Sequence, residues 1–244
     1  MKKIPPEAKE IMEGGEQVFL PHISLDCVIF GYEQNQVKVL LTEIQPQHWM
    51  LPGGYIKRTE SLDEAAHRTL KERSGLENIF LKQFHTFGDR DREFSQEIED
   101  FMRTYDPDLK APKELWIAKR FISVGYYALV RIEDTKPQPG FFAGRFDWHP
   151  IRQLPHTVLD HGHIATKAFE FLCEDLTSKD VAHHLLPRKF TMPELHQLHE
   201  SILNKKLDRS RFQKKMLALG IYERLPEMKE GVPHKRPYLY RFKY

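Results

Sequence analysis

The chain has 244 residues, with 37 Lys and Arg against 35 Asp and Glu, so its formal net charge at pH 7 is only +2. This length suffices for one medium and one small domain, each with its own core. The amino terminus lacks the apolar core of a secretory signal, and the longest largely apolar run, Phe121 to Val130, is about half of a membrane span, which argues against a secreted or membrane protein.

Residues 1–20 are predicted to be an N-terminal extension, because Pro5-Pro6 and Gly14-Gly15 interrupt any long helix. A first domain is expected over residues 21–176. It opens with two strands, Ser24 to Phe30 and Val37 to Leu41, which we expect to be joined as a hairpin.

A regularly spaced set of residues follows the turn Leu51-Pro52-Gly53. Its members are Gly54, Glu60, Arg68, Glu72, Gly75 and Leu76. Apolar residues at helical intervals predict a helix from residue 62 to about residue 74 that packs on a sheet. These apolar residues are Leu62, Ala65, Ala66 and Leu70. Positions 69, 72 and 73 share another face of the same helix.

This spacing resembles the Nudix box. The resemblance implies a Nudix fold, and in catalytic members it implies glutamates at positions 69, 72 and 73 that gather Mg²⁺ against a substrate pyrophosphate. Here these positions hold Thr69, Glu72 and Arg73. A divalent ion roughly 5 Å from the Arg73 guanidinium would be repelled by about 6 to 7 kcal/mol at an effective dielectric constant of about 20.

The box is therefore predicted to be degenerate, with no catalytic residue, no bound metal and no cofactor. The alternative is a Mg²⁺-dependent diphosphatase acting on ADP-ribose or a sugar nucleotide. In that case Arg73 would form a salt bridge on a solvated face, and metal would bind through Glu60, Glu72 and carboxylates elsewhere.

Beyond the box, Ile79 to Phe87 is expected to return to the sheet, and residues 93–118 form an insertion with a helix near Phe94 to Thr104. The insertion could be a ligand lid, a dimer-contact arm or a tolerated surface loop. Two further strands are expected, Phe121 to Arg131 and Phe146 to Trp148.

Asp160 is predicted to cap the next helix, which runs through Ala165, Ala168 and Leu172. His161 and His163 lack a third metal ligand at useful spacing, so we interpret them as capping or pocket residues. Cys27 and Cys173 fit no metal or redox spacing, which predicts two buried, reduced thiols in a cytoplasmic protein.

The two parts of the chain differ in formal charge. Val181 to Tyr244 holds 14 Lys and Arg against 6 Asp and Glu, a balance of +8, whereas the first 180 residues hold 23 and 29, a balance of −6. Such a division is typical of a chain with a different partner for each part. After a linker at about 177–189, we expect a second domain over residues 190–244.

Two helices joined by a short turn are predicted in this basic domain. Thr191 to Glu194 forms a capping box for the first, which runs through Leu195, Leu198, Ile202 and Leu203. Asp208 caps the second, Gly220 ends it, and its apolar face is Phe212, Met216 and Leu219. Strands at Ile221 to Leu225 and Tyr238 to Phe242, with a loop at residues 226–237, complete a winged helix.

The exposed side of the second helix has the residue types that contact DNA. The predicted DNA-binding residues are Arg209, Ser210, Arg211, Gln213 and Lys214 on the helix, with Lys235 and Arg236 on the wing. An RNA-binding protein is a weaker alternative, because the sequence shows no aromatic stacking platform.

An altered Nudix box followed by a winged helix resembles the Nudix-related transcriptional regulators of the NrtR and AraR type, over about residues 20–244. Segments that carry the resemblance include WMLPGGYI, FGDRDR, SVGYYALV, LDHGHI and RPYLYRF. The resemblance implies an α+β fold, a Nudix α/β/α sandwich with a C-terminal winged helix-turn-helix domain. It also implies a homodimer that binds double-stranded DNA, with a sugar or ADP-ribose-like metabolite as effector.

The former catalytic cleft is expected to bind that small sugar or nucleotide-sugar effector. The predicted ligand-binding residues are Gly53, Gly54, Glu60, Arg68, Glu72 and Arg73. The insertion at residues 93–118 is a departure from the family, so pocket geometry cannot be transferred from relatives.

Overall fold

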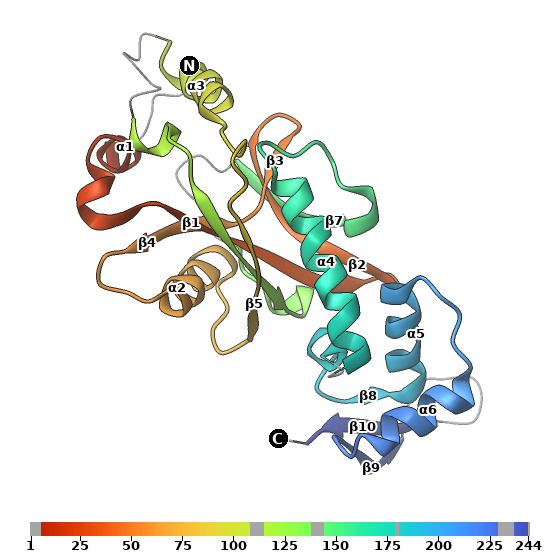
Figure 1. Cartoon of the computed structure of the whole chain (residues 1–244). Coiled ribbons are helices and arrows are strands. Elements are labelled where there is room, and N and C mark those ends of the chain that lie inside the picture. The colour runs from red at the N-terminus through yellow and green to blue at the C-terminus, as the bar shows by residue number, and fades with distance from the viewer. Residues whose placement is uncertain (1–5, 108–114, 138–143, 179–180, 229–236, 244) are drawn as a thin grey trace.

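The computed structural model describes residues 6–107, 115–137, 144–178, 181–228 and 237–243. It has a seven-stranded mixed sheet, followed by a small three-stranded sheet at the other end of the molecule (Figure 1). The predicted α+β class is confirmed.

The large sheet is built around two long strands that form a hairpin. Its strands are β1 (Phe19–Glu33), β2 (Gln36–Gln45), β3 (His48–Met50), β4 (Gly53–Lys57), β5 (Phe80–Phe87), β6 (Ile122–Leu129) and β7 (Arg145–Pro150). The strand order is β3-β2-β1-β6-β5, with β4 paired to β1 and β7 to β2. The hairpin turns at Gln34 and Asn35, whose φ values of 51° and 61° match the right-handed twist of the strands. The sequence predicted this hairpin but not the short strands β3 and β4.

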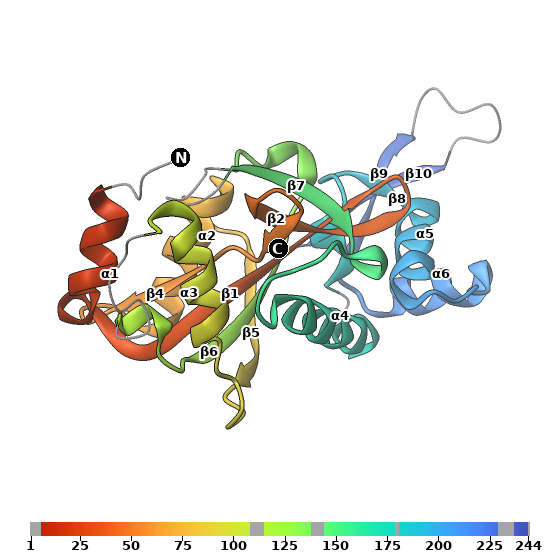
Figure 2. The ribbon, with the colours of Figure 1, turned by 90° about the horizontal axis from the view of Figure 1, so that it is seen from above.

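One helix covers each face of the sheet (Figure 2), as an α/β/α sandwich requires. Helix α2 (Leu62–Ser74) begins with a capping box of Ser61 and Glu64 and ends at Gly75, which has φ 72°. Its buried apolar residues include Ala65, Ala66 and Leu70, but Leu62 is exposed, so the predicted stripe is one residue too long. Helix α4 (His161–Ser178) covers the opposite face.

The N-terminal extension is helical, which the sequence did not predict. Helix α1 (Pro6–Val18) continues through Gly14 and Gly15 without a break. It packs on β1 and on the short helix η2 (Trp116–Ala118) of the insertion, and Met12 and Trp116 share a third core cluster. Helix α3 (Ser95–Tyr105) contributes Met102 to the same cluster.

The C-terminal domain is a winged helix. It contains η5 (Ala182–Leu185), β8 (Phe190–Thr191), α5 (Met192–Leu203), α6 (Arg209–Ala218), β9 (Tyr222–Met228) and β10 (Tyr238–Phe242), with sheet order β8-β10-β9. The predicted capping box at Thr191, the cap at Asp208 and the positive φ of Gly220 are all present. Leu219 is 42% exposed rather than buried, because α6 ends at Ala218 and the chain turns away from the core.

The two domains share a continuous core. One cluster of buried residues extends from β1, β2 and α4 into α5 and α6. Across the joint, Arg152 on the short helix η4 (Ile151–Gln153) donates to the Ile202 carbonyl at 2.9 Å, and the hydroxyls of Tyr32 and Ser201 are 3.4 Å apart. The predicted linker, 177–189, contains η5, whose Ala182 and Leu185 are buried. The winged helix is therefore packed on the sheet and on α4.

Two further sequence expectations can be compared with the structure. Cys27 is buried, but Cys173 is only partly buried, because it lies at the joint where its thiol faces the Ile202 carbonyl at 3.8 Å. Within the described ranges, none of the helices combines the length and apolar character needed to cross a membrane.

Candidate functional site

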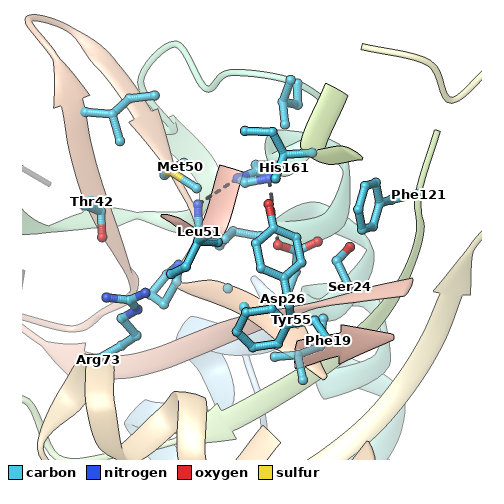
Figure 3. Close-up of a pocket in the computed structure, with 18 of the residues that line it drawn as sticks. Phe19, Ser24, Asp26, Thr42, Met50, Leu51, Tyr55, Arg73, Phe121 and His161 are labelled. Atoms are coloured by element: carbon cyan, nitrogen blue, oxygen red, sulfur yellow. Dashed lines mark hydrogen bonds and ion pairs between the residues drawn. The ribbon is translucent and has the colours of Figure 1, made fainter. Parts of the chain in front are cut away.

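A cavity of about 780 Å³ opens between the sheet, the C-terminal half of α2 and the start of α4 (Figure 3). The residues of the box that line it are Gly53, Gly54, Arg68, Glu72 and Arg73. Glu60, which was predicted to bind ligand, does not line the cavity. The structure therefore brings most of the predicted ligand-binding residues to one surface.

The N-terminal helix and the insertion complete the cavity wall. Ile11 and Met12 of α1 line it, as do Phe94, Ile98 and Ile117 of the insertion. The described part of the insertion is thus a cavity wall, in line with the lid interpretation, rather than a loose surface loop. Residues 108–114 of the insertion lie outside the described residues.

Four aromatic rings pack together beside this wall. Tyr55 and Trp116 have ring centroids 4.6 Å apart, and Phe121 lies 5.6 Å from each of them. Phe19 stacks on Trp116 at 6.1 Å. Burial raises the pKa of the Tyr55 phenol to about 12, so this hydroxyl stays protonated at neutral pH.

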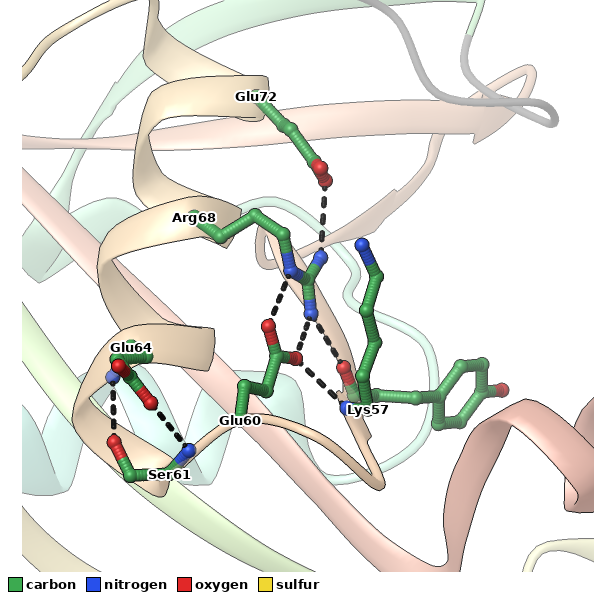
Figure 4. A network of polar contacts seen from close by, with 7 residues as sticks. Lys57, Glu60, Ser61, Glu64, Arg68 and Glu72 are labelled. Carbon is green, nitrogen blue, oxygen red and sulfur yellow. Dashed lines mark hydrogen bonds and ion pairs between the residues drawn. The ribbon is translucent and has the colours of Figure 1, made fainter.

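Two carboxylates of the box are held by Arg68 (Figure 4). The guanidinium donates from Nε to Glu60 Oε2 at 2.9 Å, from Nη2 to Glu60 Oε1 at 2.5 Å, and from Nη1 to Glu72 Oε2 at 3.2 Å. The Lys57 backbone N–H also donates to Glu60 at 2.7 Å. The hydrogen bond from Arg68 lowers the pKa of Glu60 below its ordinary value. Glu60 therefore positions Arg68, which in turn reaches the cavity.

The two altered box positions differ in their surroundings. Thr69 is 1% exposed and lies under Gly54. An ideal Cβ on Gly54 would lie 2.9 Å from Thr69 Oγ1. Arg73 is half-buried and lines the cavity, and burial lowers the pKa of its guanidinium. Across the described residues, the structure shows no hydrogen bond or ion pair to the Arg73 side chain. Arg73 thus places a cation at the helix face where the resemblance to a catalytic Nudix box implies a carboxylate.

The floor of the cavity holds polar residues that the sequence prediction missed. Asp26 is 6% exposed in the middle of β1, and its Oδ2 accepts a hydrogen bond from the Ser123 hydroxyl at 2.5 Å. The one available signal was an aspartate between Leu25 and Cys27 in a strand that otherwise reads as apolar. His161, the first residue of α4, accepts a hydrogen bond from the Leu51 backbone N–H at 2.9 Å. The pocket interpretation of His161 is confirmed.

Arg92 ties three segments together at the cavity edge. Its guanidinium pairs with the Asp160 carboxylate at 2.7 Å and donates to the Phe121 carbonyl at 2.6 Å. Asp160 immediately precedes α4, and its carboxylate therefore binds Arg92 at the start of this helix. The start of the insertion, the start of β6 and the start of α4 are thereby joined.

A second candidate site lies on the winged helix. All the predicted residues of its second helix, α6, are exposed: Arg209, Ser210, Arg211, Gln213 and Lys214. Phe212 and Met216 anchor the opposite side, and the Phe212 ring lies 5.0 Å from the ring of His196 on α5. The predicted wing residues Lys235 and Arg236 lie outside the described residues. The exposed side of α6 is therefore polar and cationic over its first two turns, whereas Leu217 is exposed in the last turn.

Each of the two parts of the chain matches a known domain family. The NUDIX domain model matches residues 20–168, and the NrtR DNA-binding winged helix domain model matches residues 182–242. The ADPR responsive transcriptional repressor NtrR of Acinetobacter baylyi is 27% identical over 231 residues, which cover 91% of this chain and 82% of that protein.

Solved structures share the two-domain fold. Shewanella oneidensis NrtR is 24% identical with a TM-score of 0.69, and the match covers 91% of this chain and 94% of that chain. The same protein complexed with a 27mer DNA gives 22% identity, a TM-score of 0.68, and coverage of 91% and 93%. The predicted sandwich with a C-terminal winged helix is confirmed.

Proposed function

Because the chain belongs to the Nudix family and carries an NrtR-type winged helix, we propose that it is a ligand-responsive transcriptional regulator that binds double-stranded DNA. Its Nudix domain serves as the sensor. The observation that carries the proposal is the cationic, exposed face of α6, on a domain whose core is continuous with the sheet beneath the cavity.

Helix α6 is the recognition helix in this proposal. Its first turn presents Arg209, Ser210 and Arg211, and the next turn adds Gln213 and Lys214. Arginine and glutamine side chains make bidentate contacts with base edges in the major groove, whereas lysines also contact phosphates. Lys235 and Arg236 would add phosphate contacts from the wing.

The cavity is the effector site. Its volume of about 780 Å³ lies within the range of small-molecule pockets, and it combines an aromatic wall with a few polar groups. The relative from Acinetobacter baylyi is named as ADPR responsive. We therefore propose ADP-ribose or a related phosphorylated sugar as the effector, with Arg73 as the partner of a phosphate group.

We further propose that the Nudix domain does not hydrolyse this ligand. Thr69 is buried beneath Gly54, Arg73 lines the cavity, and both oxygens of Glu60 accept hydrogen bonds from Arg68 or the Lys57 backbone. Of the box carboxylates, only Glu72 lines the cavity, and it would have to hold a divalent cation beside the positive charge of Arg73, which is electrostatically unfavourable.

The joint between the domains offers a path for regulation. Helix α4 begins at the cavity with His161, and its later residues pack against α5 of the winged helix. A ligand acts by favouring one arrangement of the domains, and its effect on DNA affinity cannot exceed its differential affinity for the two arrangements, typically about 1 to 3 kcal/mol.

A homodimer completes the proposal. A single recognition helix contacts too few base pairs to define a unique operator, whereas two copies related by a two-fold axis read two half-sites.

The test begins with selection of genomic DNA fragments by the purified protein, which should yield an operator. ADP-ribose and sugar phosphates are then titrated calorimetrically with a chelator present, first without and then with the operator. If a ligand changes the affinity of the protein for DNA by some factor, then DNA must change the affinity of the protein for the ligand by the same factor. Failure to enrich any DNA would contradict the regulator function, and a cavity ligand with no such linkage would contradict the sensor function.

A further inference from the structure

One oxygen of the Asp26 carboxylate accepts no hydrogen bond from the described residues. Oδ2 accepts the Ser123 hydroxyl, but Oδ1 lies 3.7 Å from His161 Nε2, which is longer than a hydrogen bond. Among the residues that the structure describes, none donates a hydrogen bond to Oδ1. Burying a carboxylate costs free energy unless donors form hydrogen bonds to it. Because Asp26 lines the cavity, a ligand there can supply the missing hydrogen bond.

His161 supplies the complementary group. The Leu51 N–H donates to His161 Nδ1, so in the neutral imidazole the proton is on Nε2, the atom nearest to Asp26. An acceptor, Asp26 Oδ1, and a donor, His161 Nε2, therefore flank a narrow gap at the cavity floor. An alcohol oxygen fits this gap because it donates one hydrogen bond and accepts another, whereas an anion would be repelled by the carboxylate.

A glycine leaves the gap open to the cavity, and two aromatic rings lie beside it. Gly53 pairs with Asp26 across β4 and β1, and a Cβ at Gly53 would lie 2.8 Å from Asp26 Oδ1. Any larger residue at Gly53 would block the carboxylate. The Tyr55 ring lies next to Asp26 and His161, with the Phe121 ring on the same side of the cavity (Figure 3). Such rings pack against the C–H faces of a cyclic ligand.

We infer that Asp26 and His161 form a subsite for a ring hydroxyl of a sugar, in which Ser123 positions Asp26 and the ligand ring packs on Tyr55 and Phe121. This inference rests on the proposed function, because it requires the cavity to be the effector site. In Figure 3, Arg73 lies on the opposite side of the cavity from Phe121, with Asp26 between them. The cavity is therefore polarised: hydroxyl groups bind at the floor, and a phosphate binds at Arg73.

The subsite also touches the element that joins the domains. His161 is the first residue of α4, whose later residues pack on α5. A hydroxyl bound between Asp26 and His161 thus contacts the sheet and α4 at once, so recognition of this hydroxyl and the position of α4 are linked.

The experiment compares ligands that differ by one hydroxyl. Full-length protein is titrated calorimetrically with ribose, arabinose, ribose 5-phosphate and ADP-ribose, and with 2-deoxyribose and 2-deoxyribose 5-phosphate. We expect wild-type protein to prefer ribose 5-phosphate over its 2-deoxy analogue by at least about tenfold, within the range for a lost buried hydrogen bond. Asp26→Asn should remove most of that preference, while Arg73→Gln should weaken the binding of ribose 5-phosphate and 2-deoxyribose 5-phosphate equally and keep the preference.

His161→Gln provides a second variant should Asp26→Asn fail to fold, as judged by its thermal unfolding, and it should reduce the same preference. Binding in which neither variant alters the hydroxyl preference would overturn the hydroxyl subsite while leaving the sensor function intact. If wild-type protein binds none of these ligands, the sensor function and the hydroxyl subsite are both wrong.

Discussion

The indole of Trp116 occupies the space where a side chain at Gly15 would begin. An ideal Cβ on Gly15 would lie 2.3 Å from Trp116 Cζ2, and the indole N–H donates to the Ile11 carbonyl one turn earlier in α1. This contact docks α1 on the insertion and places Ile11 and Met12 in the cavity wall.

The two adjacent glycines of α1 should therefore respond differently to alanine. Gly14→Ala meets nothing within 4 Å and should leave the unfolding midpoint unchanged or raise it, since alanine favours a helix by about 1 kcal/mol over glycine. Gly15→Ala should lower the midpoint and expose α1 to proteolysis, because Trp116 must move. Equal behaviour of the two variants in thermal unfolding and limited proteolysis would show that α1 is not docked in this way.

The DNA contact can be tested on α6. Arg211→Ala with Lys214→Ala should abolish specific operator binding, because each base contact contributes about 1 to 3 kcal/mol. Lys9→Ala is a matched control, since Lys9 is also an exposed cation on a helix, in α1 at the end of the molecule away from α6 (Figure 2). Fluorescence anisotropy with operator and with random DNA measures both affinities. Operator affinity that survives the double substitution would identify another surface as the interface.

Catalysis offers a direct check on the altered box. With ADP-ribose and Mg²⁺, we expect turnover far below about 1 s⁻¹, the lower end of the ordinary enzyme range. The pair Thr69→Glu with Arg73→Glu restores the carboxylates, but Thr69 is fully buried against Gly54, so Arg73→Glu alone is the variant expected to fold well and regain some activity. Chromatographic detection of AMP and ribose 5-phosphate measures the rate. Wild-type turnover at or above that limit would establish the diphosphatase alternative.

Oligomeric state sets the form of the operator. Sedimentation at micromolar concentration should show a dimer, and the selected operator should be an inverted repeat with half-sites one or two helical turns apart. Shifting the half-sites by half a turn should abolish cooperative binding, because the second recognition helix would then face the wrong side of the duplex. A protein that stays a monomer, both alone and on DNA, would contradict the prediction.

The domain joint should loosen in mild acid. His184 lies 4.9 Å from Phe80 of β5 and 4.1 Å from His183, whose ring stacks on Phe242 of β10 at 3.8 Å. Burial, with a smaller effect of His183, lowers the pKa of His184 from 6.5 to about 4.

Since the folded pKa of His184 lies below the unfolded value, the unfolded chain binds more protons between these two values. The contribution of neutral His184 to the stability of the folded state is complete above pH 6.5 and is lost as the pH falls toward about 4. His184→Gln stays neutral, so between about pH 7.5 and about pH 5 its melting midpoint should fall less than that of the wild type. The same decrease in both proteins would show that other groups cause the pH dependence.

Local patterns were sufficient to predict most of the elements. The capping box at Thr191, the cap at Asp208 and the glycine at position 220 are short-range features, and each is present where the sequence placed it. The spacing of Glu60, Arg68 and Glu72 likewise predicted a shared cluster, because residues on one helix and the turn before it keep fixed distances.

The remaining features depend on contacts between distant segments. Gly14-Gly15 reads as a helix break in isolation, yet Trp116, about a hundred residues later, needs a glycine at that point and holds α1 in place. Similarly, Asp26 joins Ser123 and His161 only because β1 pairs with β6 and α4 begins beside them.

Sequence alone thus determined the two domains, the altered box and the cationic second helix of the winged helix, because these follow from periodicity, capping and charge along a continuous stretch of chain. Only the tertiary structure decided that the N-terminal extension and the insertion line the cavity, and that a buried carboxylate lies at its floor. The physical reason is that a cavity is made of surfaces from separate elements, and its polarity depends on which side chains the fold brings within a few ångströms of one another.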